Sequence, residues 1–113
     1  MEHDIRAHAR FVPISAQKVR LVADLVRGRP VVEALNLLKF TPGGASHPIL
    51  KVVSSAMSNG EENFGVSRED LYVHTIFVDE APTRKWRRFG ARGRFKPWLR
   101  RNSHVTVILR ERQ

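Results

Sequence analysis

The strongest chemical signal in this sequence is a run of cationic side chains interleaved with aromatic rings near its C-terminal end. Nine Lys and Arg residues fall within 18 positions, and seven of them are arginine: Arg84, Lys85, Arg87, Arg88, Arg92, Arg94, Lys96, Arg100 and Arg101. Arginine forks bind phosphate oxygens two at a time. Four rings in the same run are candidates for stacking on unpaired bases: Trp86, Phe89, Phe95 and Trp98. This composition predicts that the segment binds a nucleic acid.

The distribution of charge supports a polyanionic partner. Residues 1–80 hold nine Lys and Arg against ten Asp and Glu, whereas residues 81–113 hold eleven against one acid, Glu111. The formal net charge of +9 therefore lies entirely in the last third of the chain. Such repulsion disfavours compaction unless a polyanion neutralises it. A solvated charged face is the alternative, but such faces usually mix the two signs.

A second, smaller basic group lies in the first 30 residues. It comprises Arg6, Arg10, Lys18, Arg20, Arg27 and Arg29. These side chains are candidates for a second nucleic-acid contact, on which a folded body would rest while the basic run reaches further. An ordinary solvated surface explains them equally well at this stage.

Other chemistry is not indicated by the residue pattern. The five histidines have no metal-ligand spacing, and the chain has no cysteine, which excludes disulfides and thiolate metal sites. Asp79 and Glu80 are neighbours on an expected strand and point to opposite faces, so they do not form a catalytic pair. We expect no enzyme activity, cofactor or metal. No apolar run approaches the roughly 18 residues of a membrane span, and the first residues do not resemble a signal peptide.

The elements that would position the basic residues follow from hydrophobic periodicity. Residues 5–12 alternate as a half-buried strand does. Three helices are expected next: one between Ser15 and Gly28, a second with Pro30 in its first turn, and a third ending or fraying at Asn59-Gly60. Their apolar stripes are Val19, Val22, Ala23 and Val26; Val31, Leu35 and Leu38; and Ile49, Val52, Val53 and Ala56. Residues 63–69 are expected to form a loop, and residues 71–78 and 105–109 two strands.

About 26 residues without apolar periodicity separate the last two strands, which is too long for a structureless loop in a compact domain. We therefore predict that both strands continue outward as one hairpin that turns at Gly90 and Gly93. Extensions of about ten residues would reach roughly 33 Å. The expected fold is α+β: one domain, residues 1–113, with three helices packed on a small three-stranded antiparallel sheet. We call residues 1–80 and 102–113 the body, and the protruding hairpin of residues 81–101 the basic arm.

Composition alone leaves three classes of protein open. They are an RNA-binding protein, an architectural DNA-binding protein with a basic β-ribbon arm, and a membrane-active cationic domain. The third is the weakest, because no continuous apolar face lines the basic arm. Within the arm, Trp86 and Trp98 also have a structural interpretation, as a clasp that pairs across the two strands.

Four segments, in register along nearly the whole chain, resemble the family of ribosomal protein L-twenty-two of the large subunit. They are SAQKVRLVADLVRG at 15–28, FVDE at 77–80 followed by Pro82, GARGR at 90–94 and RNSHVTV at 101–107. The resemblance implies an α+β body near the exit of the nascent-chain tunnel, a hairpin that runs through ribosomal RNA, and a role in subunit assembly. It places the hairpin tip, which lines the tunnel, at Gly90, Ala91, Arg92, Gly93 and Arg94.

The resemblance also implies the partners. They are large-subunit ribosomal RNA, neighbouring large-subunit proteins and the nascent polypeptide that passes the tip, in a cytoplasmic or organellar ribosome and with no homo-oligomer. The chain departs from the family pattern at Gly60, where the third helix usually carries alanine, which is why we expect that helix to end early. Trp86, Phe95, Pro97 and Trp98 make this tip region bulkier than usual in the family.

Overall fold

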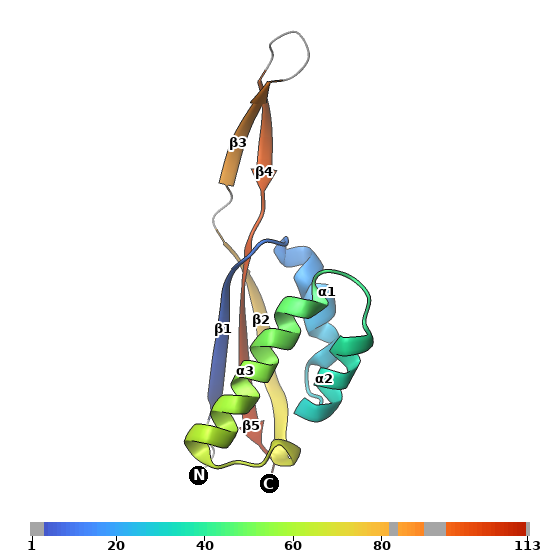
Figure 1. Cartoon of the computed structure of the whole chain (residues 1–113), viewed down its shortest axis with the longest axis vertical. Helices are drawn as coiled ribbons and strands as arrows, with labels where there is room; N and C mark the ends of the chain where they lie inside the picture. Colours follow the sequence, from blue (N-terminus) through green and yellow to red (C-terminus); the bar gives the residue numbers. More distant parts are fainter. Residues whose placement is uncertain (1–3, 82–83, 90–94, 113) are drawn as a thin grey trace.

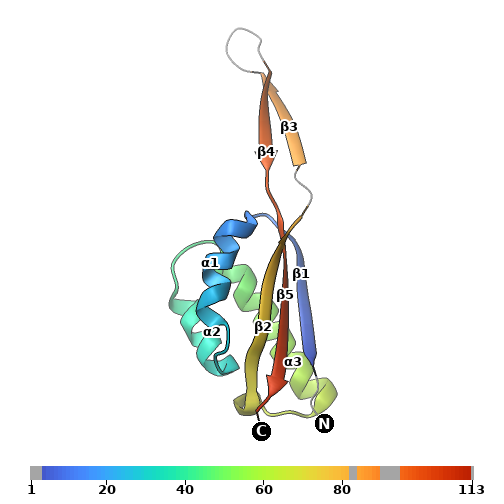
Figure 2. The ribbon, with the colours of Figure 1, turned by 180° about the vertical axis from the view of Figure 1, so that it is seen from behind.

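Three helices cover one face of a three-stranded antiparallel sheet, and a two-stranded arm projects from one end of this body (Figure 1). The computed structural model describes residues 4–81, 84–89 and 95–112, with the backbone alone for 84–89 and 95–100. From behind, the strands lie in front of the long green helix, and the two blue and cyan helices lie to the side of the sheet (Figure 2). The chain measures 64 × 25 × 18 Å along its principal axes. The predicted α+β class is therefore confirmed.

The sheet places the strand that returns from the arm at its centre. Its strands, in the order β1-β5-β2, are β1 (Ile5–Val12), β5 (Ser103–Glu111) and β2 (Leu71–Glu80). Val105, Val107 and Leu109 of β5 are fully buried against the helices, as the period of two predicts. The predicted strands 71–78 and 105–109 are confirmed but are longer, since β2 and β5 stay paired as far as Glu80 and Ser103.

The helices bury the stripes that periodicity predicts except at Leu35, which is half-buried while Ala34 beside it is buried. They are α1 (Ala16–Val26), α2 (Val31–Phe40) and α3 (Ser46–Phe64), followed by a short 3-10 turn, η1 (Arg68–Asp70). Val19, Ala23 and Val26 of α1 have no exposed surface, and neither do Val31 of α2 and Val53 of α3. These side chains form one apolar core with the inner face of the sheet.

The ends of α1 and α2 differ slightly from expectation. Ser15 is the N-cap of α1, but its hydroxyl makes no capping hydrogen bond. Gly28 follows α1 with φ +81°, a conformation that glycine adopts without strain, and its N–H donates to the Val73 carbonyl at 2.8 Å. Pro30 stands just before α2 rather than in its first turn, because its carbonyl already accepts the first helical hydrogen bond, from Ala34.

The prediction that the third helix ends or frays at Asn59-Gly60 is wrong. Helix α3 continues to Phe64 and ends at Gly65, whose φ is +64°. The expected loop of residues 63–69 is accordingly reduced to the segment before η1. Gly60 is buried, and a Cβ there would lie 3.0 Å from side-chain carbons of both Ile5 and Leu71. Glycine thus serves close packing of α3 on the sheet, and tertiary contacts override its low helix propensity.

The basic arm contains two strands, β3 (Arg84–Phe89) and β4 (Phe95–Arg100), which pair in antiparallel register from Arg84–Arg100 to Phe89–Phe95. Between the arm and the sheet, the Ala81 N–H donates to the Asn102 carbonyl at 3.0 Å. The predicted continuation of both strands beyond the sheet is confirmed in the described residues. The predicted turn at Gly90 and Gly93 lies outside them.

Candidate nucleic-acid interface

Three of the cations predicted to bind nucleic acid lie at the end of the body from which the arm departs, and they have no partner among the side chains that the structure describes. Arg10 is near the end of β1, Lys18 is in the first turn of α1, and Arg101 immediately follows β4. All three residues are exposed, and no hydrogen bond or ion pair holds their side chains within the described part of the chain. Their charges are therefore available to an external anion.

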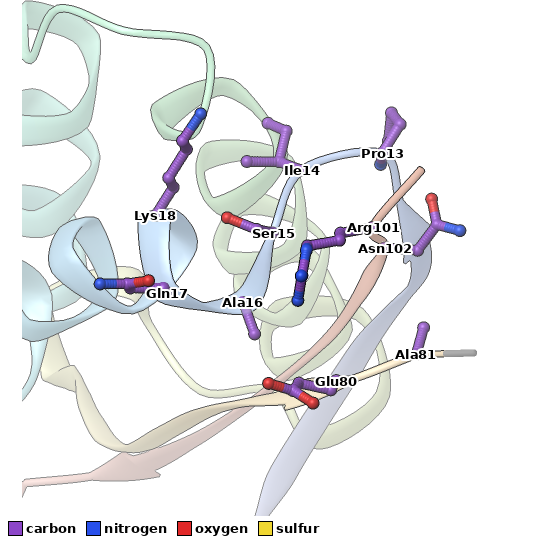
Figure 3. A pocket seen from close by; sticks show the side chains of 10 residues that line it. All are labelled: Pro13, Ile14, Ser15, Ala16, Gln17, Lys18, Glu80, Ala81, Arg101 and Asn102. Atoms are coloured by element: carbon purple, nitrogen blue, oxygen red, sulfur yellow. The ribbon is translucent and has the colours of Figure 1, made fainter. Parts of the chain in front are cut away.

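A polar hollow of about 690 Å³ lies at this junction (Figure 3). The turn before α1, the end of β2 and the segment that returns from the arm form its walls. It is lined by Pro13, Ile14, Ser15, Ala16, Gln17, Lys18, Glu80, Ala81, Arg101 and Asn102. The Arg101 side chain extends from the returning segment toward the start of α1 (Figure 3). Two unpaired cations, a hydroxyl and two amides suit a phosphate-bearing ligand.

The hollow also contains residues that sequence reasoning did not single out. Gln17 and Asn102 carry no charge, so a search for basic clusters passes over them. Glu80 is the one acid in the lining, and no ion pair joins it to Arg101 among the described contacts. A polyanion entering here would meet this carboxylate, which limits how deeply phosphates are accommodated. Only knowledge of which element ends meet could have identified these three positions.

Two of the body arginines predicted to contact nucleic acid, Arg20 and Arg27, make hydrogen bonds within the protein instead. Arg20 donates from Nε and Nη2 to the Val78 carbonyl, at 3.1 and 2.8 Å. Arg27 donates from Nη2 to the Ile76 carbonyl at 2.7 Å and from Nη1 to Asp24 at 2.6 Å. Both guanidinium groups thus reach from α1 to the outer edge of β2.

The remaining predicted body contacts are paired with acids. Arg29 donates to Glu33 at 2.7 Å and to the Leu25 carbonyl at 2.6 Å. Arg6 lies 3.9 Å from the carboxylate of Asp4, which also accepts a hydrogen bond from Arg110 at 2.6 Å. The Arg110 hydrogen bond holds the pKa of Asp4 below its ordinary value. These pairs reduce the positive potential of the body away from the arm.

The predicted contacts on the arm can be placed by backbone register only. Arg84 is opposite Arg100 and Arg88 is opposite Lys96, so the two strands place cations at paired positions. Directly paired like charges are destabilising without an anion between them. This register therefore supports the expectation that the arm needs a polyanionic partner.

The aromatic residues of the arm are also in register, since Trp86 pairs with Trp98 and Phe89 with Phe95. This pairing is the one that the clasp interpretation of the tryptophans requires. Base stacking stays a prediction, as do the contacts of Lys85 and Arg87. The predicted tip, Gly90, Ala91, Arg92, Gly93 and Arg94, lies outside the described residues.

Three histidines in the body have structural partners. His8 Nδ1 lies 3.1 Å from the Thr106 hydroxyl, and His104 Nδ1 accepts the Phe11 N–H at 3.0 Å. His74 contacts Thr75 and Arg110. Across the part of the chain that is described, no three acidic or histidine side chains gather closely enough to hold a metal ion. Nor does any helix there combine the length and apolarity needed to cross a membrane.

Comparison with known proteins gives a consistent result. The family model described as "Ribosomal protein L22p/L17e" matches residues 7–110. The chain is 48% identical over 108 residues to "Large ribosomal subunit protein uL22" of Pediococcus pentosaceus, covering 96% of this chain and 92% of that one. The protein of the same name from Carboxydothermus hydrogenoformans is 44% identical over 110 residues, or 97% of each chain. That from Ligilactobacillus salivarius is 48% identical over 104 residues, 92% of this chain and 90% of the other.

Proposed function

The chain belongs to the ribosomal protein L22p/L17e family, and from this premise we propose that it is a structural constituent of the large ribosomal subunit that binds ribosomal RNA. Its partners are that RNA and neighbouring ribosomal proteins, in the ribosome of the cytoplasm or of an organelle. It acts by binding and shaping RNA, without catalysis. The alternative of an architectural DNA-binding protein gains no support from these comparisons.

One observation supports the proposed location of the RNA-binding site. The unpaired cations Arg10, Lys18 and Arg101 lie where the arm leaves the body, whereas Arg6 and Arg29 are paired with acids. An RNA strand that follows the arm would reach Lys18 and Arg101, which line the hollow (Figure 3), and Arg10 near the end of β1. Basic residues where the arm leaves the body, followed in sequence by those of the arm, offer successive contacts for a phosphate backbone.

In this proposal the body of residues 1–80 and 102–113 rests on the surface of the folded RNA, and the arm of residues 81–101 threads between RNA segments. The arm supplies most of the phosphate contacts, through Arg84, Lys85, Arg87, Arg88, Arg92, Arg94, Lys96 and Arg100. Its tip, residues 90–94, lines the exit tunnel and meets the nascent polypeptide. An arm held by several RNA segments also brings them together, which aids subunit assembly.

Binding of this kind is tested by its dependence on salt. Six to ten phosphate contacts predict a slope of log K against log salt of roughly −4 to −9. The assay is equilibrium binding of the full chain to protein-free large-subunit RNA between 50 and 200 mM salt, with bent duplex DNA as competitor. The proposal expects the RNA to win and the protein to sediment with large subunits. Preferential binding of the bent DNA would favour the architectural alternative instead.

A further inference from the structure

Successive backbone carbonyls on the outer edge of β2 accept hydrogen bonds from α1 and the segment after it. Because β2 is an edge strand, every second carbonyl points away from β5 and needs another donor. The Val73 carbonyl accepts from the Gly28 backbone N–H. An irregularity between Val73 and Thr75 resets this alternation, and the next two outward carbonyls, those of Ile76 and Val78, accept from the side chains of Arg27 and Arg20.

These contacts use N–H donors of each guanidinium group that could otherwise bind a phosphate. Arg20 directs its Nε–H and one Nη2–H, which form one face of the donor fork, at a single carbonyl oxygen. Arg27 divides its two terminal nitrogens between the β2 edge and the carboxylate of Asp24, which also neutralises its charge. The Val78 contact thus takes one of the two donor pairs of Arg20 and fixes the position of the guanidinium group, and only the pair formed by Nη1 and Nη2 remains for another acceptor.

We infer that Arg20 and Arg27 are positioning residues: they hold the outer edge of β2 and so fix the direction of the basic arm, while Lys18 and Arg101 beside them contact the RNA. This inference rests on the proposed function, because it divides the basic residues predicted to bind RNA into those that contact the RNA and those that position the arm. Lys18 and Arg20 lie two residues apart on α1, so charge alone does not separate the two classes.

The place of the Arg20 contact explains why it matters for the arm. Val78 lies three residues before Ala81, whose N–H makes the last described hydrogen bond before the strands enter the arm. The distance from Ala81 to the end of β3 at Phe89 is roughly 26 Å in extended chain. A pivot of about 5° at the base would displace the end of such a strand by roughly 2 Å, enough to misplace a charged hydrogen bond.

Replacement of arginine by lysine separates the two roles. The variant Arg20→Lys keeps the charge but loses the paired donors that the Val78 carbonyl accepts. We expect it to keep the salt slope of binding to large-subunit RNA while protection of β2 and β5 amides near Val78 from hydrogen exchange falls. The variant Lys18→Gln should do the reverse, making the slope shallower by about 0.7–0.9 and leaving exchange unchanged.

Arm direction is measured by RNA cleavage from a tethered probe, which the absence of cysteine in the chain makes simple. An iron chelate is attached to Leu99→Cys in the arm, or to Ser55→Cys on α3, and the full chain is bound to large-subunit RNA. With Arg20→Lys, cleavage from Leu99→Cys should shift or spread over neighbouring nucleotides while cleavage from Ser55→Cys stays in place. The stability control is Gly65→Ala, which strains the end of α3 far from the arm and should move neither pattern.

Four outcomes decide the inference. A shifted arm pattern with an unchanged salt slope supports it. An unchanged arm pattern with Arg20→Lys would overturn it. A salt slope that Arg20→Gln makes as shallow as Lys18→Gln does would also overturn it, because that loss would show that Arg20 contacts phosphate. Failure of the unsubstituted protein to bind the RNA in a salt-dependent manner would overturn the proposed function itself, and this inference with it.

Discussion

The three exposed cations where the arm leaves the body allow the most quantitative test of RNA binding. We consider the triple variant Arg10→Gln, Lys18→Gln and Arg101→Gln, which removes three exposed cations that have no partner within the described residues. Each lost phosphate contact makes the salt slope shallower by about 0.7–0.9. At 0.15 M salt, that slope corresponds to roughly a fourfold to fivefold loss of affinity per contact, on a 1 M reference. Three contacts together predict a loss of about 100-fold and a slope shallower by roughly 2 to 3.

The assay is a binding titration of the full chain with large-subunit RNA at four or five salt concentrations, together with thermal unfolding of each protein. The matched control is a variant with Arg29→Gln and Arg68→Gln, whose guanidinium groups are paired with Glu33 and Glu61. The control should change the slope little, because its charges are already neutralised. Equal losses in the two variants would refute the argument that partner-free cations at the root make the contacts.

Three further predictions concern the body and are checked by chemical denaturation. The variant Gly60→Ala should change the free energy of unfolding by less than about 1 kcal/mol, because a gain in helix propensity offsets a tight contact. The larger side chain of Gly60→Val should cost roughly 2–3 kcal/mol. Equal effects of the two variants would show that space at this position is not limiting. Ser103→Ala should stabilise the protein by about 1 kcal/mol, because its buried hydroxyl has no partner in the described structure, and a loss of stability would reveal one. The hydrogen bond from Arg110 lowers the pKa of Asp4 in the folded protein. The Asp4 carboxylate therefore contributes fully to the free energy of unfolding above its ordinary pKa of 3.8, and this contribution is lost as pH falls through the lower folded value. The variant Asp4→Asn should lose less stability in acid than the unsubstituted protein, and an unchanged dependence of stability on pH would contradict the pairing.

Local patterns were sufficient to predict the body because its elements follow their periods closely. The stripe of Val19, Ala23 and Val26 is buried along its whole length, and Gly28 ends the first helix as its conformational freedom suggests. The interruption of β1 was not visible in the sequence. Phe11 has φ +55° at an irregularity between Ala9 and Val12, which continuous alternation does not reveal.

Prediction failed where distant segments decide the outcome. Gly60 looked like a helix end because propensity is a local property, whereas its burial against β1 and β2 is a tertiary one. Arg20 and Lys18 looked alike, since net charge does not show which cation faces an unpaired carbonyl of an edge strand. The hollow at the arm root was likewise invisible, because its walls come from three separate parts of the chain.

We propose that the arm of this large-subunit protein runs through ribosomal RNA to the exit tunnel. A density map of large subunits containing the full chain tests it most directly. The account predicts the body on the RNA surface with Arg10, Lys18 and Arg101 against phosphates, the arm enclosed by RNA, and residues 90–94 at the tunnel wall. An arm that lies in solvent, or a body whose unpaired cations face away from RNA, would contradict it.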